Sequence, residues 1–144
     1  MNFEEIEKYI REHNKDLEQL EYLIDGEFFS KPIYEAILRK VLKDKPKRVV
    51  DVGCNLGLYG YLFANKGIEY IGIDLYKYKR YETDKIKFIQ ANYLDVRDKF
   101  KDDVIISCLC IGYLIPVEEV KGKRLIVNGY NGLVATAKEI KLRS

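Results

Sequence analysis

The sequence has no tryptophan, one histidine and only three cysteines, Cys54, Cys108 and Cys110. Three cysteines without regular ligand spacing, and a single His13, do not favour a metal site. The N-terminal segment carries no signal-peptide pattern, and the longest uncharged run, 104–117, is too short to cross a bilayer. We therefore expect a cytoplasmic protein with no metal and no membrane partner.

An excess of charge of either sign is also missing. The 25 Lys and Arg residues nearly balance the 23 Asp and Glu residues, for a net charge of +2. This balance gives no whole-chain electrostatic argument for nucleic acid as a partner. Hydrophobic residues make up 47% of the 144 residues, enough for one folded domain. We predict a single domain over 1–144, with an N-terminal helical extension over 1–29 and a core over 30–144.

The N-terminal extension has a helical pattern. Apolar residues recur every three or four positions from Phe3 to Ile24, with charged residues on the other faces. Asn14 is a potential break in this helix, and Gly26 is its expected end. We expect this apolar seam to pack on its own domain, with a homodimer through the same helix as the alternative. His13 lies on the seam and is expected to be packed or partly exposed, with no role as a base.

From Ser30 onward, helical and strand patterns alternate. A helix beginning at Ser30 and ending before Pro46 precedes the core, which has predicted strands over 48–52, 69–74, 86–90, 104–110 and 124–129 and helices over 58–65 and 94–100. Nearly all-apolar central strands indicate a parallel sheet covered on both faces. Asn131-Gly132 predicts a hairpin turn and an antiparallel edge strand over 133–142. We expect an α/β protein of three layers, with a mostly parallel sheet of about six strands.

A glycine-rich turn follows the first strand, in Asp51-Val-Gly-Cys-Asn-Leu-Gly57. Such a turn between a strand and a helix lets a ligand approach the backbone and the free N–H groups of the helix. The segment does not match the phosphate-loop pattern GxxxxGK[ST]. It also fails the dinucleotide pattern GxGxxG, because Asn55 and Leu58 stand where two glycines are required. A nucleotide-dependent oxidoreductase is therefore disfavoured.

Asp51, Gly53 and Gly57 resemble motif I, E/D-x-G-x-G-x-G, of the class I S-adenosylmethionine-dependent methyltransferases. Asn55 replaces the middle glycine, and Asn tolerates left-handed backbone angles better than most residues. Asp74 follows Gly53 by 21 residues (74 − 53), where a carboxylate can accept ribose hydroxyls. The resemblance spans roughly residues 30–130 and implies a Rossmann-like fold with S-adenosylmethionine as cofactor. An acidic loop suits this cofactor, which carries an amino cation and no phosphate.

The resemblance implies further cofactor contacts. Leu75 would lie along the adenine, and Asn92, with Tyr93 beside it, would face the adenine amino group. A simple turn residue is an equally supported interpretation of Asn92. Cys54 and Cys108 would lie close together at one sheet edge, where lining the cofactor pocket is favoured over pairing or sharing a metal. Cys110 is expected to pack in the core.

The segment from Tyr76 to Tyr81 interleaves tyrosines with Lys77, Lys79 and Arg80. Aromatic residues beside cations can hold single-stranded nucleic acid, and this is the best local argument for such an acceptor. With a net charge of only +2, we favour a solvated connector whose tyrosines cover the sheet edge or the adenine.

The resemblance implies a further helix and two strands after the fifth strand, and the 15 residues (144 − 129) that follow it here leave room for one hairpin strand. We therefore predict a minimal methyltransferase whose acceptor is unidentified (a small molecule, a protein or RNA), with its acceptor site completed by the N-terminal helices or a second subunit. Ser107 and Tyr113 are the polar residues nearest the expected site, but neither is a good base at neutral pH, so no catalytic residue is assigned. The alternative is a non-catalytic binding or structural module with the same fold.

Overall fold

The computed structural model describes residues 1–25, 30–131 and 134–143, and its centre is a six-stranded sheet. The strand order is β3-β2-β1-β4-β5-β6, with β1 (Arg48–Val52), β2 (Glu69–Asp74), β3 (Ile86–Gln90), β4 (Val104–Ser107), β5 (Arg124–Asn131) and β6 (Val134–Ile140). The first five strands are parallel, and β6 runs antiparallel to β5 with Asn131 opposite Val134. The predicted mostly parallel sheet with an antiparallel edge strand is confirmed. Gly132 of the predicted turn lies outside the described residues.

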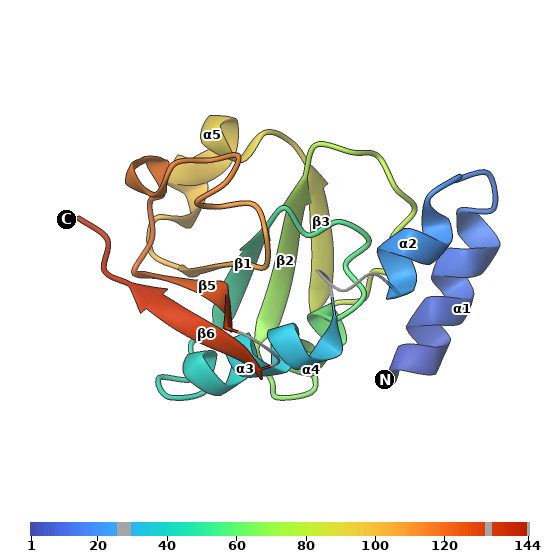
Figure 1. Ribbon diagram of the computed structural model, residues 1–144, viewed down its shortest axis with the longest axis horizontal. Helices are drawn as coiled ribbons and strands as arrows, with labels where there is room; N and C mark the ends of the chain where they lie inside the picture. The colour runs from blue at the N-terminus through green and yellow to red at the C-terminus, as the bar shows by residue number, and fades with distance from the viewer. Residues whose placement is uncertain (26–29, 132–133, 144) are drawn as a thin grey trace.

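Helices cover both faces of the sheet, as a Rossmann-like α/β fold requires (Figure 1). They are α1 (Phe3–His13), α2 (Leu20–Asp25), α3 (Lys31–Val41), α4 (Gly60–Ala64) and α5 (Tyr93–Val96), with short 3₁₀ turns η2 (Arg97–Phe100) and η3 (Val117–Glu119). The alternation of side chains along each strand divides the core in two. One buried cluster joins Val49 and Tyr70 to α1–α4, and the other joins Val50 and Ile71 to Tyr93 and Phe100.

The N-terminal seam packs within the chain. Ile6, Ile10 and Ile24 are at most 2% exposed and share one cluster with Ile33 and Ile37 of α3. Figure 1 shows α1 and α2 beside the β3 edge of the sheet. The preferred prediction of self-packing is thus supported, and a dimer that needs this seam exposed gains no support from it.

Asn14 ends α1, as the sequence suggested, and the chain turns before α2 begins. His13 is exposed and stacks on Tyr9, with its Nδ1 2.8 Å from the Tyr9 carbonyl oxygen. Gly26, the expected end of this helical segment, lies outside the described residues. In the part of the chain that the structure describes, no helix is both long enough and apolar enough to cross a membrane.

Two predicted elements next to the cavity are shorter in the structure. The helix expected over 58–65 spans only α4, because the turns that follow Gly53 continue to Tyr59. The strand expected over 104–110 ends at Ser107. There the Ser107 Oγ accepts hydrogen bonds from the N–H groups of Cys110 and Ile111, at 3.0 and 2.9 Å, and bends the chain out of the sheet.

Candidate functional site: a cavity at the carboxyl ends of the strands

A cavity of about 690 Å³ lies where β1, β2, β3 and β4 end. In parallel α/β sheets this edge is where ligands bind. The glycine turn after β1 contributes Gly53 and Asn55, and the end of β2 contributes Asp74. Further lining residues come from the loops after β2, β3 and β4, from α5, from α2 and from the residue before it: Gln19, Leu23, Leu75, Tyr76, Tyr78, Ala91, Asn92, Tyr93, Leu94, Leu109, Cys110, Leu114 and Ile115. The volume is typical of small-molecule sites, about 300–1,000 Å³.

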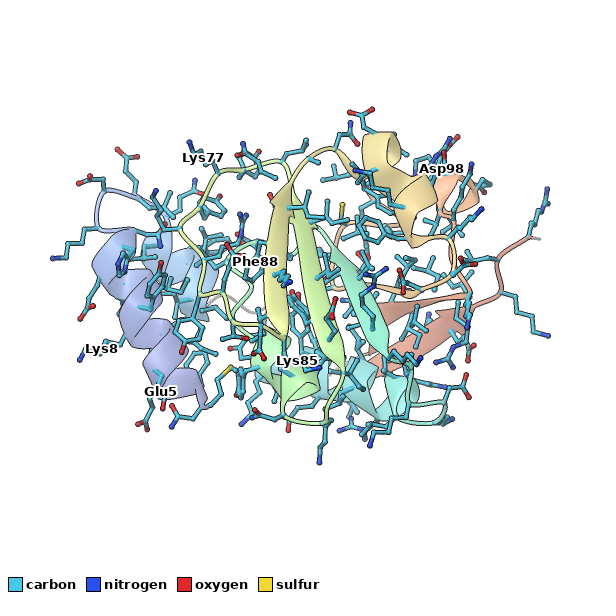
Figure 2. All side chains as sticks on the ribbon, turned by 180° about the vertical axis from the view of Figure 1, so that it is seen from behind. Glu5, Lys8, Lys77, Lys85, Phe88 and Asp98 are labelled. Carbon is cyan, nitrogen blue, oxygen red and sulfur yellow. The ribbon has the colours of Figure 1, made fainter. Side chains whose placement is uncertain are left out.

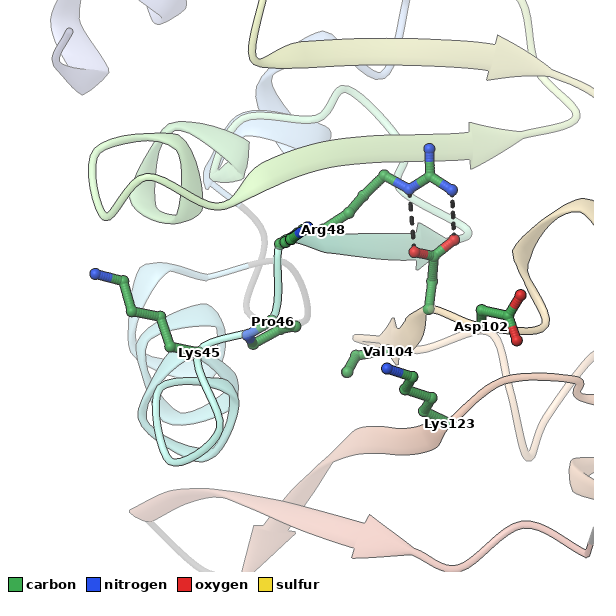
Figure 3. Close-up of a pocket in the computed structure, with 8 residues that line it drawn as sticks. Lys45, Pro46, Arg48, Asp102, Val104 and Lys123 are labelled. Carbon is green, nitrogen blue, oxygen red and sulfur yellow. Dashed lines mark hydrogen bonds and ion pairs between the residues drawn. The ribbon is translucent and has the colours of Figure 1, made fainter.

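A second hollow, of about 410 Å³, lies at the opposite, amino ends of β1 and β4 (Figure 3). Its main polar feature is a two-pronged ion pair, in which Arg48 Nε and Nη2 donate to Asp103 at 3.1 and 2.6 Å. This pair joins the first residue of β1 to the residue before β4, and it satisfies both side chains. Because parallel α/β sheets bind ligands at the carboxyl ends of their strands, the cavity at that end is taken as the candidate site.

The glycine turn has the backbone geometry that the motif demands. Gly53, Asn55 and Gly57 have φ angles of +77°, +56° and +68°, so all three motif positions are left-handed. Asn55 thus has a left-handed φ angle, which asparagine tolerates better than most residues. This is the property for which it was expected to replace the middle glycine of the motif. The turn is held against β2 by two hydrogen bonds from Gly53 N–H and Cys54 N–H to the Ile73 carbonyl, at 2.8 and 3.2 Å.

Asp74 ties this turn to the end of β2. Its Oδ2 accepts from Asn55 N–H at 2.8 Å, and its Oδ1 accepts from Tyr76 N–H at 2.9 Å. Its side chain is only 10% exposed, and Arg80 Nη2 lies 3.9 Å from Oδ1. The structure places Asp74, Gly53 and Asn55 on one cavity, and their role in binding a cofactor stays a prediction.

Arg80 is a supporting residue that sequence reasoning did not identify. It is 9% exposed, and its Nε donates to the Asn55 carbonyl at 2.6 Å while its Nη2 donates to the Tyr76 carbonyl at 2.9 Å. Its guanidinium also lies over the rings of Tyr78 and Phe88, at 5.2 and 5.6 Å. The alternation of cations and tyrosines in the segment from Tyr76 to Tyr81 did not indicate that Arg80 would be buried. Arg80 is engaged in these contacts and is not presented to a nucleic acid.

Asp51 lies behind the cavity and does not line it. It is fully buried on the α3 side of the sheet, where its Oδ2 accepts from the hydroxyls of Tyr34 and Tyr70 at 3.0 and 2.5 Å. Burial raises the pKa of Asp51 to about 7, and the two tyrosine hydrogen bonds oppose that rise. Its Oδ1 has no hydrogen-bond partner among the described residues.

The adenine residues implied by the resemblance all line the cavity. Leu75 is 62% exposed and offers a free apolar side chain. Asn92 Oδ1 caps α5 by accepting from Leu94 N–H at 3.0 Å, so the turn interpretation of this residue has structural support. The Tyr93 hydroxyl points away, donating to the Lys121 carbonyl at 3.2 Å.

The cysteine assignment is reversed. Cys54 and Cys108 are 2% and 0% exposed and are not among the residues that line the cavity, whereas Cys110 lines it. Cys54 is a free thiol that packs against Gly72, where an added Cβ would lie 2.7 Å from the Cys54 Sγ. The strand ended three residues earlier than expected, so Cys110 left the sheet and turned to the cavity.

Gly57 also packs inside the protein instead of lining the cavity. A Cβ at Gly57 would lie 2.3 Å from the ring of Phe88, which Figure 2 shows on β3. The absence of a side chain at this position therefore makes room for an aromatic ring of the neighbouring strand, and the glycine is explained without a ligand.

The cavity offers little acid–base chemistry. Burial raises the pKa of the Cys110 thiol to about 11 and also raises the pKa of Tyr93, so both groups are protonated at neutral pH. The Ser107 hydroxyl is buried under its two loop hydrogen bonds. Within the described ranges no group of three His, Cys, Asp or Glu residues could hold a metal ion. The cavity is thus suited to binding and orienting more than to proton transfer.

No known protein family and no curated protein matches this sequence. Among solved structures, the chain is similar to a Burkholderia thailandensis 1,6-didemethyltoxoflavin-N1-methyltransferase crystallised with 1,6-didemethyltoxoflavin and S-adenosylhomocysteine. That similarity has a TM-score of 0.59 at 11% identity and covers 82% of this chain and 66% of the other. This chain therefore spans slightly less than two thirds of that enzyme's length.

Two weaker similarities add no argument, because their TM-scores are below 0.5. A point mutant of MtNAS gives 0.42 at 15% identity, over 89% of this chain and 70% of that one. The bifunctional kinase-methyltransferase WbdD gives 0.41 at 17% identity, over 83% of this chain and 31% of that one. At these identities the comparisons show the fold alone: the chain has a Rossmann-like α/β fold, similar to that of the Burkholderia thailandensis enzyme.

Proposed function

We propose that this protein binds S-adenosylmethionine in the cavity at the carboxyl ends of the strands and transfers its methyl group to an acceptor. The observation that carries the proposal is the joint placement of the left-handed turn at Gly53 and Asn55 and the Asp74 carboxylate on one cavity. The solved methyltransferase with the similar fold, crystallised with S-adenosylhomocysteine, supports the same choice of cofactor.

The Asp74 carboxylate fits a ribose. A carboxylate has about four lone-pair sites, and Asp74 uses one on each oxygen for the N–H groups of Asn55 and Tyr76. The remaining sites can accept two hydroxyl groups. The exposed Leu75 beside it offers an apolar surface to a flat base, and Asn92 keeps its amide N–H groups for hydrogen bonding.

Asp51 fits the cofactor less directly. Its Oδ1 is a buried oxygen without a partner among the described residues, and buried polar atoms of this kind normally have one. Because Asp51 is fully buried, we propose that a bridging water connects this oxygen to the cofactor's amino group. Gly53, which follows Asp51 by two residues, forms the cavity wall between them.

When bound, S-adenosylmethionine supplies a methyl group on a positively charged sulfur, which passes to an acceptor lone pair while the sulfur keeps the electrons of the broken bond. The chain's own contribution is to hold and orient the two reactants, which by itself can supply a large part of the rate enhancement. With Cys110 and Tyr93 protonated, the chain favours an acceptor atom that is nucleophilic without losing a proton first. The same scarcity of bases is what keeps a non-catalytic binding module as the second candidate.

Calorimetric titration of the full chain with S-adenosylhomocysteine tests the cofactor. We expect saturable binding, weakened at least tenfold in Asp74→Asn, because the amide lacks the charge and one acceptor oxygen (about 1.4 kcal/mol). Asp84→Asn changes an exposed carboxylate before β3 and should bind like the unchanged chain. No heat at millimolar ligand, or equal affinity in all three proteins, contradicts the proposal.

Methyl transfer is tested separately from binding. Incubation with labelled S-adenosylmethionine and mixed small-molecule, RNA and protein acceptors should label one class. Binding without transfer to any of them would favour the non-catalytic module.

A further inference from the structure

The loop after β4 presents an apolar surface to the cavity. Leu109, Cys110, Leu114 and Ile115 line the cavity from this side, and we call these four residues the loop face. Leu114 is 82% exposed, more than any other large apolar side chain that the structure describes, and Tyr113 beside it is 74% exposed. Clustered exposed apolar side chains mark ligand-binding or contact surfaces, whereas isolated ones need no explanation.

The exposure of Leu114 is built into the loop. Ser107 Oγ holds the start of the loop through the N–H groups of Cys110 and Ile111. Leu114 N–H donates to the Cys110 carbonyl at 2.9 Å, and Gly112 N–H donates to the Ile115 carbonyl at 2.7 Å. Gly112 has a φ of +94°, which a glycine adopts without strain. A preorganised loop of this kind binds a ligand with little loss of conformational freedom.

The charges around the cavity select the kind of ligand. Asp74 is the one charged residue among the described residues that line the cavity, and no lysine, arginine or histidine is among them. Lys77 is exposed on the neighbouring loop and points to the outer surface in Figure 2, and Arg80 is engaged by the Asn55 and Tyr76 carbonyls. An anionic ligand would lose its hydration without gaining a partner of opposite charge.

The N-terminal helices add to the same apolar character. Leu23 of α2 lines the cavity and is 7% exposed, and Gln19 before α2 contributes an uncharged amide. The residues assigned to the cofactor lie on the turn after β1, the end of β2 and the loop after β3. Of the lining not assigned to the cofactor, Tyr76, Tyr78 and Leu94 lie on the same side as Asp74 and Asn92 in the chain, and the loop face and α2 make up the apolar remainder.

We infer that the loop face binds a neutral, apolar small molecule, which is the methyl acceptor of the proposed reaction. The assignment of this site to the methyl acceptor rests on the proposed function. The binding of an apolar molecule at the loop face can be measured independently of it. The cavity volume of about 690 Å³ is suited to a small molecule beside the cofactor.

Two fluorescent probes that share an aryl-naphthylamine frame test the inference on the full chain. N-phenyl-1-naphthylamine is neutral, and 8-anilino-1-naphthalenesulfonate carries one negative charge. We expect saturable binding of the neutral probe, at least tenfold tighter than that of the anionic probe. Equal or tighter binding of the anionic probe would overturn the inference.

The position is tested with Leu114→Asn, which keeps the number of side-chain heavy atoms and removes the apolar character. Because Leu114 is 82% exposed, the fold should tolerate the change. Affinity for the neutral probe should fall about tenfold or more, as expected for the loss of one buried leucine contact. Val134→Asn is the matched control, since Val134 is 65% exposed on β6 and is not among the cavity residues. Unchanged binding in Leu114→Asn, or an equal loss in Val134→Asn, would overturn the inference.

Calorimetry with S-adenosylhomocysteine on the same samples separates the two proposals. Leu114→Asn should bind this ligand like the unchanged chain. Cofactor binding without neutral-probe binding overturns only the present inference. Neutral-probe binding that depends on Leu114, without cofactor binding, overturns the proposed function and leaves the apolar binding site established.

Discussion

At the scale of single residues, the two motif carboxylates have different surroundings and different chemistry. Asp74 lines the cavity and is surrounded by N–H donors and Arg80. Asp51 directly precedes Val52 of the cavity wall, but it lies among Tyr34, Tyr70 and apolar side chains, where burial raises its pKa to about 7. The first carboxylate is available to a ligand, and the second is a buried group whose ionisation is costly.

Asp51 should make stability depend on pH. A carboxyl whose pKa is about 3.9 when unfolded and about 7 when folded binds more protons in the folded state between these values. The contribution of Asp51 to the free energy of unfolding is therefore complete below about pH 4, where the carboxyl is protonated in both states. It is lost as the pH rises from there through 7, because the unfolded chain ionises first. In Asp51→Asn this loss is absent, so the variant should gain about 2 kcal/mol relative to the unchanged chain between pH 5 and pH 7.

Urea unfolding at pH 5, 6, 7 and 8 measures this difference. Asp84→Asn, an exposed carboxylate, should follow the unchanged chain at every pH. Parallel stability curves for Asp51→Asn and the unchanged chain would show that Asp51 ionises normally in the folded protein.

At the scale of elements, the end of α1 is anchored to the loop between β2 and β3. Asn14 is 8% exposed, and its Nδ2 donates to the carbonyls of Ile10 and Lys79 at 2.8 and 2.9 Å. Its Oδ1 accepts from Lys79 N–H at 3.1 Å. The loop that carries Arg80 is therefore held from one side by α1 and from the other by the turn at Asn55.

Asn14→Ala should destabilise the protein by about 2 kcal/mol, because it leaves two backbone groups of Lys79 without partners in a part-buried place. The amide of Lys79 should also exchange hydrogen faster. Asn65→Ala is a matched control, since Asn65 makes one exposed hydrogen bond to the Met1 carbonyl, and its loss should cost less than about 0.5 kcal/mol. If urea unfolding gave the same loss of unfolding free energy for Asn14→Ala and Asn65→Ala, the role of Asn14 would be limited to ending α1.

At the scale of the whole molecule, the N-terminal helices share the core of the sheet. Ile10 is fully buried in the cluster that contains Ile37 of α3 and Val49 of β1. Gln19 and Leu23 reach the cavity from this segment, in line with the hypothesis that N-terminal helices complete the acceptor site. The division into an extension over 1–29 and a core over 30–144 remains a prediction.

Ile10→Ala tests whether both parts unfold together. We expect a loss of about 2–5 kcal/mol, as for other large-to-small changes in a core. Circular dichroism and tyrosine fluorescence should report one common transition, because a shared core couples the two parts. Lys8→Ala, on the outer side of α1 in Figure 2, should change stability by less than about 0.5 kcal/mol. Two separate transitions, with only the first affected by Ile10→Ala, would show that the helices are an independent extension.

The sequence by itself determined the order of strands and helices, the parallel sheet with its antiparallel edge, and the left-handed turn at Asn55. These features depend on local patterns: the period of apolar residues, the glycine spacing and the polar residues that end helices. Asp74 belongs to the same group, because the end of a parallel strand next to the turn is a place that topology fixes.

Only the tertiary structure decided which side chains face the cavity. Asp51 turned to the helix side with Val49, Arg80 became buried among the carbonyls it bonds, and Cys110 replaced Cys54 and Cys108 at the cavity wall. Each outcome depends on contacts between segments distant in sequence: two tyrosines from α3 and β2, the Asn55 carbonyl, and the serine that ends β4 early. Local sequence patterns do not predict these contact partners, because the burial and the hydrogen bonds of each side chain are determined only when distant segments pack together.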